Sequence, residues 1–435
     1  MFGYYIHAAW RSLKKNPVLT ALMVLAIGLG IGASMTMLTV LHVMSDDPLP
    51  GRSAQLFAPH LDPLPANFKQ NVYAPDPSVN FTYPDAMALL SAHRASLQAA
   101  MAGGTLLARS AVAGQRPFYV DGRFTTPDFF AMFGVPFLKG SGWSQSDEDA
   151  HARMVVLSES LSRQLFGTAD SIGRMARLGD VDLRVVGVTA DWQPNPMFYA
   201  DTSAKAFSDG DQFFLPLATA MDLKFDTSGH QSGWSDDAIA PTSPSLTWLQ
   251  FWVQLKDAAQ VAAYRQFLVD YSAQQQKLGR FQRSPDHARL YGLMEWLAYQ
   301  RRAPSDIRLQ LGLAFAFLAV CIVNIVALLL AKFLRRSGEI SIRRALGARR
   351  RDIFAQLGVE SFVIGVAGGT LGLLLAQVGL WNVRHRPDDY AHLAHMDASM
   401  LLGTFLLAVS SSTLAGLMPA WRACRVTPAL QLKSQ

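Results

Sequence analysis

The residues with the most distinctive chemistry lie in one basic segment, SGEISIRRALGARRRDI, which runs from Ser337 to Ile353 between two apolar stretches. The guanidinium groups of Arg343 and Arg344 suit phosphates or carboxylates, which they bind through paired hydrogen bonds. A plain polybasic loop would need charge alone. Apolar side chains are nevertheless interleaved with the arginines, namely Ile340, Ile342, Ala345 and Leu346. The pattern predicts a short two-faced helix that Gly347 ends and that docks a partner with one face.

Catalytic chemistry is not indicated by the sequence. A P-loop needs a Gly-Lys dipeptide to cradle phosphates, and this dipeptide does not occur in the chain. The G-x-S-x-G, H-E-x-x-H and C-x-x-C patterns are also absent. His385, His392, His395 and Asp397 fit an ordinary polar loop better than a metal site. We therefore expect a non-catalytic chain without a metal or cofactor of its own, with ATP and magnesium on a partner if ATP is used.

The chain contains four long apolar runs, and the basic segment lies between the second and the third of them. They cover residues 17–43, 307–332, 354–382 and 399–421. Each is long enough to cross a bilayer, which takes about 20 helical residues. The first run is too long for the apolar core of a signal peptide and is expected to remain as an anchor. The chain is therefore expected to be a membrane protein with four transmembrane α-helices.

Basic residues at the ends of the runs predict their orientation, because they stay preferentially on the cytoplasmic side. They are Arg11, Lys14 and Lys15 before the first run, Arg335, Arg336, Arg343, Arg344 and Arg349 to Arg351 between the second and third, and Arg422, Arg425 and Lys433 after the fourth. Both termini and the basic segment are thus expected in the cytoplasm. The long segment between the first two runs carries more acidic than basic residues, which argues against nucleic-acid binding.

Glycines within the runs are spaced for close helix packing. Pairs four residues apart let two backbones approach each other. They are Gly28 and Gly32 in the first run and Gly365, Gly368, Gly369 and Gly372 in the third. Glu360 is the one ionisable residue of the third run, and we expect it near the lipid headgroups rather than in a proton relay.

The long exterior segment is expected to form a mixed α/β domain of two lobes, one of them inserted at about residues 110–200. Helices are predicted at 82–98, 158–167 and 258–277 from their caps and apolar stripes. Apolar or alternating runs at 118–124, 154–157, 183–188, 213–217 and 249–255 predict strands. Both cysteines lie outside this segment, so no disulfide holds it together.

These features divide the chain into nine segments. They are a cytoplasmic N-terminal segment (1–16), a first span (17–43), an exterior domain (44–306), a second span (307–332), the basic cytoplasmic loop (333–353), a third span (354–382), a short exterior loop (383–398), a fourth span (399–421) and a cytoplasmic tail (422–435).

Several stretches together resemble the MacB/FtsX-type ABC transporter permeases. GEISIRRALGARRRDIFAQLGVES, from Gly338 to Ser361, is similar to the signature that follows the second span in that family. PAWRACRVTPALQL near the C-terminus is similar to the family's tail, and WRSLKKNPVLTALMVLAIGLGIG to its first span. FTTPDFFAMFGVPFLKGSGW and VVLSESLSRQLFGTADSIGRMARLGDVDLRVVGV are similar to its periplasmic core domain.

The resemblance implies a permease of the bacterial inner membrane that works as a dimer and engages an ABC ATP-binding subunit. Gly338 to Gly347 would lie at the ATPase contact, with Glu339, Arg343 and Arg344 as polar anchors. Motion driven by ATP would pass through the first two spans to the periplasmic domain. The sequence lacks the fused N-terminal ATPase domain of MacB, so the ATPase is expected on a separate polypeptide. The second permease subunit is either another copy or a paralogue, and a periplasmic adaptor and an outer-membrane channel are further possible partners.

Two functions fit this organisation. The chain could export or release a substrate, such as a drug, a peptide or a lipoprotein. Alternatively, the same coupling could switch a periplasmic partner, as in a signalling permease of the FtsX kind. A third reading, a membrane-anchored enzyme, would need a catalytic constellation that the motifs do not provide. Co-purification of a periplasmic adaptor would favour export, and a stable periplasmic enzyme or sensor would favour signalling.

Overall fold

The computed structural model divides the chain into two compact units, a membrane unit (Met1–Ser45 with Ala303–Gln435) and an exterior unit (Asp46–Arg302). The residues that it describes are 11, 14, 16–69, 76–112, 114–200, 207, 209–236, 238–300, 305–335, 342, 347–385, 396 and 398–425.

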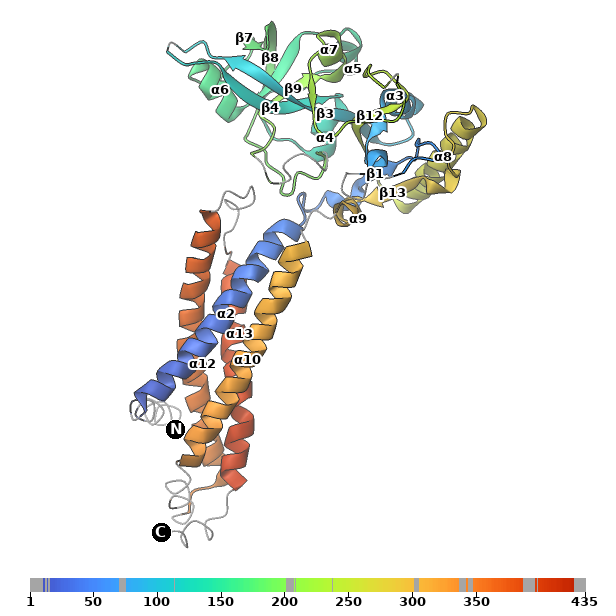
Figure 1. The fold of residues 1–435 in the computed structure, drawn as a ribbon. Coiled ribbons are helices and arrows are strands. Elements are labelled where there is room, and N and C mark those ends of the chain that lie inside the picture. Colours follow the sequence, from blue (N-terminus) through green and yellow to red (C-terminus); the bar gives the residue numbers. More distant parts are fainter. Residues whose placement is uncertain are drawn as a thin grey trace. The chain divides into compact units, whose positions relative to one another are not determined.

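Four long helices make up the described part of the membrane unit and lie side by side in Figure 1. They are α2 (Pro17–Ser45), α10 (Ser305–Arg335), α12 (Arg350–Arg384) and α13 (Ala398–Arg425). Each contains a stretch long and apolar enough to cross a membrane: Pro17–Val43, Leu309–Phe333, Arg350–Arg384 and Met400–Trp421. The four predicted spans are therefore confirmed, and the chain is a membrane protein.

The exterior unit contains short helices and a large sheet. Its helices are α3 (Tyr83–Ala92), α4 (Asp128–Phe133), α5 (Gln145–Asp149), α6 (Glu159–Phe166), α7 (Leu217–Asp222), α8 (Ala258–Lys277) and α9 (Leu293–Tyr299), with the short turns η1 (Ser53–Gln55), η2 (Pro77–Val79) and η3 (Pro285–His287). Its strands are β1 (Leu56–His60), β2 (Phe81–Thr82), β3 (Leu97–Arg109), β4 (Phe118–Thr125), β5 (Phe137–Gly140), β6 (Met154–Ser158), β7 (Met175–Leu178), β8 (Val181–Thr189), β9 (Phe213–Pro216), β10 (Thr227–Ser228), β11 (Ser232–Gly233), β12 (Leu246–Gln254) and β13 (Arg289–Gly292). The predicted mixed α/β class is confirmed.

The strands form one hydrogen-bonded network in the order β13-β1-β12-β3-β4-β9-β6-β8-β5. Strand β7 pairs with both β8 and β3, so β3, β4, β9, β6, β8 and β7 close into a ring. The ring includes β3 and β9, which lie outside the range 110–200 expected for the inserted lobe. Because β3 pairs with β12 as well as with the ring, the sheet is continuous through both expected lobes.

Two hydrophobic cores cover the two faces of this network. Side chains alternate between the faces along a strand, and β12 shows this directly. Phe251 and Val253 belong to one core, whereas Trp252 between them belongs to the other. Strand β6 divides its apolar residues in the same way, with Val155 and Leu157 on one face. The cores thus follow the faces of the sheet and do not correspond to one core per lobe.

Local capping signals located several helices correctly. Ser158 accepts a hydrogen bond from the backbone N–H of Leu161 and begins α6, and Gly167 ends α6 with a φ of +72°. The predicted helix at 258–277 is also confirmed. The prediction of a helix at 82–98 was wrong beyond residue 92. His93 adopts a left-handed conformation that ends α3, and residues 97 and 98 belong to β3.

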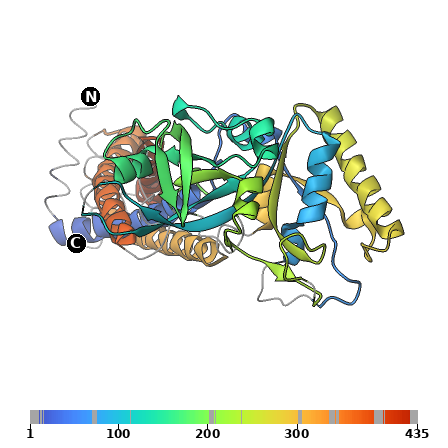
Figure 2. The same cartoon turned by 90° about the horizontal axis from the view of Figure 1, so that it is seen from above.

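Helices α3 and α8 run side by side in the exterior unit, as Figure 2 shows. The buried carboxylate of Asp85 joins them, because its Oδ1 accepts a hydrogen bond of 2.6 Å from the hydroxyl of Tyr271. The same oxygen accepts a hydrogen bond from Arg280, whose guanidinium pairs with it at 2.5 Å. This arrangement gives the charge of Asp85 a partner, which a buried carboxylate needs.

A second buried carboxylate, that of Glu148, connects α5 to α7. Its Oε2 accepts a hydrogen bond of 2.8 Å from Trp143 Nε1, and its Oε1 accepts one of 2.8 Å from the backbone N–H of Ala218. Burial nevertheless disfavours the charged form, and it raises the pKa of Glu148 from 4.5 to about 7. The hydrogen bonds from Ala218 and Trp143 oppose that shift.

The raised pKa of Glu148 predicts a pH dependence of stability. The folded state binds this proton more tightly than the unfolded state, so the stabilisation is complete below pH 4.5 and is lost as the pH rises through about 7. We expect the free energy of unfolding of the native chain, relative to Glu148→Gln, to fall by about 3 kcal/mol across this window. Denaturant unfolding of the full chain, followed by tryptophan fluorescence, measures it. Glu159→Gln on α6 is the matched control, and an unchanged pH profile in Glu148→Gln would contradict the assignment.

Candidate functional site in the membrane helices

Two residues of the predicted ATPase-coupling segment lie in the described part of the chain. Ile342 is helical and its side chain is 59% exposed. Gly347 has a φ of +99°, a left-handed conformation that favours glycine. The remaining residues of the segment, Gly338, Glu339, Ile340, Arg343, Arg344, Ala345 and Leu346, lie outside the described residues.

The C-terminal end of the basic segment forms the start of α12. This helix begins at Arg350, and Arg349 is its N-cap residue. Arg349, Arg350 and Arg351 are exposed at this helix start. Positive charge at a helix N-terminus opposes the helix dipole, and Asp352 in the first turn offsets it only in part. The arginines therefore do not serve the stability of α12. The exposed side chains of Arg349 and Arg351 suit contact with anionic lipid headgroups or with an acidic partner.

The six predicted packing glycines all lie where α12 meets a neighbouring helix. Gly28 and Gly32 of α2 face Leu371 and Leu375, because a Cβ added at either glycine would come within 2.9 Å of the leucine side chain. Gly368 and Gly372 of α12 face α2 in return, and a Cβ at Gly368 would lie 2.6 Å from Ile27 Cγ2. These four glycines allow α2 and α12 to approach closely.

The other two predicted glycines of α12 face α13. A Cβ at Gly365 would lie 2.8 Å from Ser412 Cβ, and one at Gly369 would lie 2.8 Å from Ala408 Cβ. A hydrogen bond accompanies this contact, from Ser412 Oγ to the backbone carbonyl of Ser361 at 2.9 Å. Helix α12 thus presents small residues to α2 on one side and to α13 on another.

Helix α10 joins α2 through a hydrogen bond that the sequence analysis did not foresee. Ser34 Oγ of α2 donates to the carbonyl of Ala314 in α10 at 3.0 Å, and also to the carbonyl of Gly30 within its own helix. Serine near small residues is typical of helix contacts in membranes. This bond links the two helices that precede and follow the exterior unit in the chain.

A buried ion pair joins α10 to α12. Lys332 Nζ and Glu360 Oε1 are in direct contact, and the two side chains are only 1% and 0% exposed. The headgroup position expected for Glu360 stays a prediction, and the structure gives this residue a specific partner, Lys332. The two charges lie near the same end of neighbouring apolar runs, which makes them candidates for a pair, but only the packing of α10 and α12 brings them together.

The described residues contain no group of three His, Cys, Asp or Glu side chains that could hold a metal ion. His392, His395 and Asp397 lie outside those residues. His385 is described, and its Nδ1 lies 2.8 Å from the backbone carbonyl of Trp381.

The family assignment rests on two matches that together cover most of the chain. Residues 20–270 match the MacB-like periplasmic core domain, and residues 311–428 match the FtsX-like permease C-terminal domain. The chain belongs to the MacB/FtsX-type ABC transporter permeases. The resemblance noted from the motifs is thus confirmed, and the family consists of permease components that work with ABC ATPases.

Curated relatives agree with this family. The chain is 26% identical over 437 residues to the pyoverdine export ATP-binding/permease protein PvdT of Pseudomonas entomophila, covering 99% of this chain and 59% of the relative. It is 26% identical over 264 residues to the macrolide export ATP-binding/permease protein MacB of Bdellovibrio bacteriovorus, covering 61% of this chain and 35% of the relative. The chain therefore spans about three fifths of the length of the PvdT protein that it matches.

Among solved structures, the chain is similar to the periplasmic region of MacB from Actinobacillus actinomycetemcomitans. The sequence identity is 13% and the TM-score is 0.38, over 59% of this chain and 97% of that one. It is also similar to the extracellular domain of the noncanonic ABC-type transporter YknZ from Gram-positive bacteria, with 13% identity and a TM-score of 0.32 over 50% of this chain and 95% of the other.

Proposed function

We propose that this chain is the permease subunit of an ABC export system in a bacterial inner membrane. Its membrane unit passes ATP-driven motion of an ATPase to the exterior unit, which acts on a substrate in the periplasm. The observation that carries the proposal is the combination of the MacB-like periplasmic core and the FtsX-like permease domain in one chain. The relatives named for pyoverdine and macrolide export support a drug, a peptide or a similar molecule as the substrate.

ATP and magnesium are held by an ABC ATP-binding unit outside these 435 residues in this proposal. The chain has no Gly-Lys dipeptide and hence no P-loop within its 435 residues. The contact with the ATPase is formed by residues 338–347, with Glu339, Arg343 and Arg344 as its polar anchors. The exposed side chain of Ile342 supports an apolar face available to a partner in this segment.

Helices α2 and α10 transmit the motion, because the exterior unit is inserted between them in the chain. The proposal places both termini in the cytoplasm and the exterior unit in the periplasm, which follows the distribution of basic residues. Two permease subunits, identical or paralogous, form the working dimer. A periplasmic adaptor and an outer-membrane channel complete the export route.

Charge reversal in the coupling segment tests the proposal. We expect Arg343→Glu with Arg344→Glu to weaken ATPase binding at least ~100-fold, because two charge-assisted contacts become repulsive. The measurement is co-purification of the ATPase with the full chain from its native membrane in gentle detergent. Insertion into the membrane should be unchanged.

Two controls separate a specific contact from a general charge effect. Arg343→Lys with Arg344→Lys keeps the charge and should retain much of the binding. Arg109→Glu with Arg177→Glu makes the same change of net charge at exposed positions of the exterior unit and should have no effect. Unchanged ATPase recovery with the Arg343 and Arg344 reversal would refute the coupling role. Recovery of an ATPase together with a periplasmic enzyme or sensor, and without transport, would favour the signalling function.

A further inference from the structure

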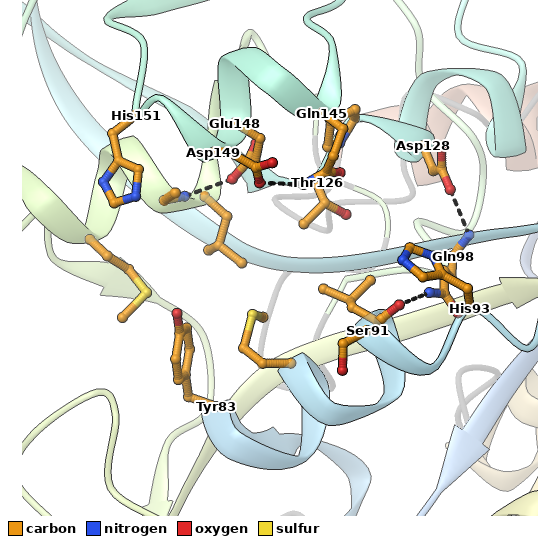
Figure 3. A pocket seen from close by; sticks show the side chains of 16 residues that line it. Tyr83, Ser91, His93, Gln98, Thr126, Asp128, Gln145, Glu148, Asp149 and His151 are labelled. Carbon is orange, nitrogen blue, oxygen red and sulfur yellow. Dashed lines mark hydrogen bonds between the residues drawn. The ribbon is translucent and has the colours of Figure 1, made fainter.

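The exterior unit contains a cavity of about 530 Å³ between α3, α5 and α7 (Figure 3). This volume lies in the range of small-molecule sites, which is about 300–1,000 Å³. The motif analysis did not point to it, because its walls combine α3, α5 and α7, which are more than fifty residues apart in the chain, with residues that lie between α3 and α5. Residues of α3 line one side, and residues of α5 and α7 line the other.

Acidic side chains are prominent among the residues that line the cavity, which also include His93 and His151. Asp128, Glu148 and Asp149 contribute carboxylates, and none of the described lining residues is Lys or Arg. Asp149 is exposed at the end of α5, whereas Glu148 is buried. A positively charged ligand would be attracted here, and an anion would be repelled.

The cavity wall also contains the buried side-chain amide of Gln98. The side chain of Gln98 lines the cavity and its residue is only 5% exposed. Its Nε2 donates to the backbone carbonyl of Leu90. Its Oε1 is buried and has no hydrogen-bond partner among the described residues. An acceptor left in this state costs about 1–3 kcal/mol, and because the atom has almost no accessible surface, a ligand in the cavity does not reach it in this structure.

The remaining walls are apolar and adaptable. Met87 and Leu90 of α3 face Leu217 and Met221 of α7 across the cavity. Methionine side chains adjust to ligands of different shape because they are unbranched and polarizable. Such walls suit the carbon skeleton of a ligand whose charged end lies near the carboxylates.

Two lining residues also have an unusual backbone conformation. His93 and His151 have φ angles of +46° and +52°, in the left-handed region where residues other than glycine are uncommon. His151 also pairs with Asp222 of α7. Residues held in such conformations are concentrated at functional sites, where the surrounding structure maintains them.

From the cavity, its carboxylates and its apolar walls, we infer that the exterior unit binds an organic ammonium ligand with an apolar body. The ammonium group lies by Asp149 and Glu148, and the carbon skeleton lies against Met87 and Met221. This binding needs neither ATP nor an ATPase, so it stands apart from the proposed coupling.

Three probes with the same indole body test the ligand class: tryptamine, the neutral alcohol tryptophol and the anion indoleacetate. Binding is measured by calorimetry on the full chain in nanodiscs, with empty nanodiscs as the reference for lipid partitioning. We expect tryptamine to bind at least ~10-fold more tightly than tryptophol, because the ammonium adds a charge-assisted hydrogen bond. Indoleacetate should not bind.

Variants locate the site. Asp149→Asn changes an exposed residue and should weaken tryptamine binding about 3–10-fold without changing tryptophol binding. Met87→Trp fills the cavity and should abolish binding of both. Asp180→Asn, at an exposed position on the turn between β7 and β8, is the matched charge control and should change the binding of neither probe.

Three results would each overturn the inference: no binding of tryptamine, equal binding of tryptamine and tryptophol, or a tryptamine affinity that Asp149→Asn leaves unchanged. Loss of ATPase recruitment in the coupling variants would leave these measurements unaffected.

Discussion

Lys332→Met should destabilise the membrane unit by about 3–5 kcal/mol, the cost of leaving a buried charge without its partner. Lys332 and Glu360 are in contact and almost completely buried between α10 and α12. Removing the lysine takes the ion-pair partner away from the buried Glu360 carboxylate. The measurement is thermal unfolding of the purified full chain in detergent.

The double variant Lys332→Met with Glu360→Met is the control that isolates the pair. Apolar replacement of both members of a buried ion pair is often neutral or stabilising, so this variant should recover most of the lost stability. A double variant as unstable as the single one would show that Lys332 contributes by packing alone.

Gly368→Leu should separate α2 from α12 and destabilise the membrane unit by at least about 1–3 kcal/mol, the usual cost of overpacking. A Cβ at this position would lie 2.6 Å from Ile27 Cγ2 and 2.7 Å from Ile27 Cβ, which is closer than such atoms approach in proteins. The clash involves a branched side chain of the buried core, so it cannot be relieved by a simple change of rotamer. Thermal unfolding in detergent and disulfide cross-linking between α2 and α12 measure the two effects.

Gly358→Leu provides a matched control on the same helix. A Cβ there would have no neighbour within 4 Å. The same gain in volume and helix propensity should therefore be tolerated and is expected to leave cross-linking between α2 and α12 unchanged. Equal loss of stability in both variants would mean that Gly368 is not a packing position.

Strand β3 shows why part of the exterior fold escaped prediction. Its sequence, LQAAMAGGTLLAR, is rich in alanine and glycine, which have a low intrinsic preference for strands. The pairing of β3 with β12 and β4 decides its conformation. Gly104 is required within the strand, because a Cβ there would lie 2.3 Å from the ring of Phe124. This requirement comes from a residue on another strand and leaves no signal in the local sequence.

The helix at α6 shows the opposite case. Ser158 and Gly167 mark its two ends through local hydrogen bonds and a local backbone conformation. A signal of this kind depends on a few neighbouring residues, so it can be read without the rest of the fold. Helix α3 lies between the two cases, since Thr82 marked its start correctly but nothing in the sequence showed that His93 would end it.

The sequence by itself determined the membrane class, the four spans, the mixed α/β class of the exterior unit and the family. Hydropathy over a span, helix caps and contiguous motifs are local properties, and they do not depend on which segments meet in space. Tertiary structure alone decided that Lys332 pairs with Glu360, that β7 closes a ring with β3, and that the carboxylates of α5 face α3 across a cavity. Each of these depends on contacts between residues far apart in the chain, which the geometry of packing selects from many possible partners.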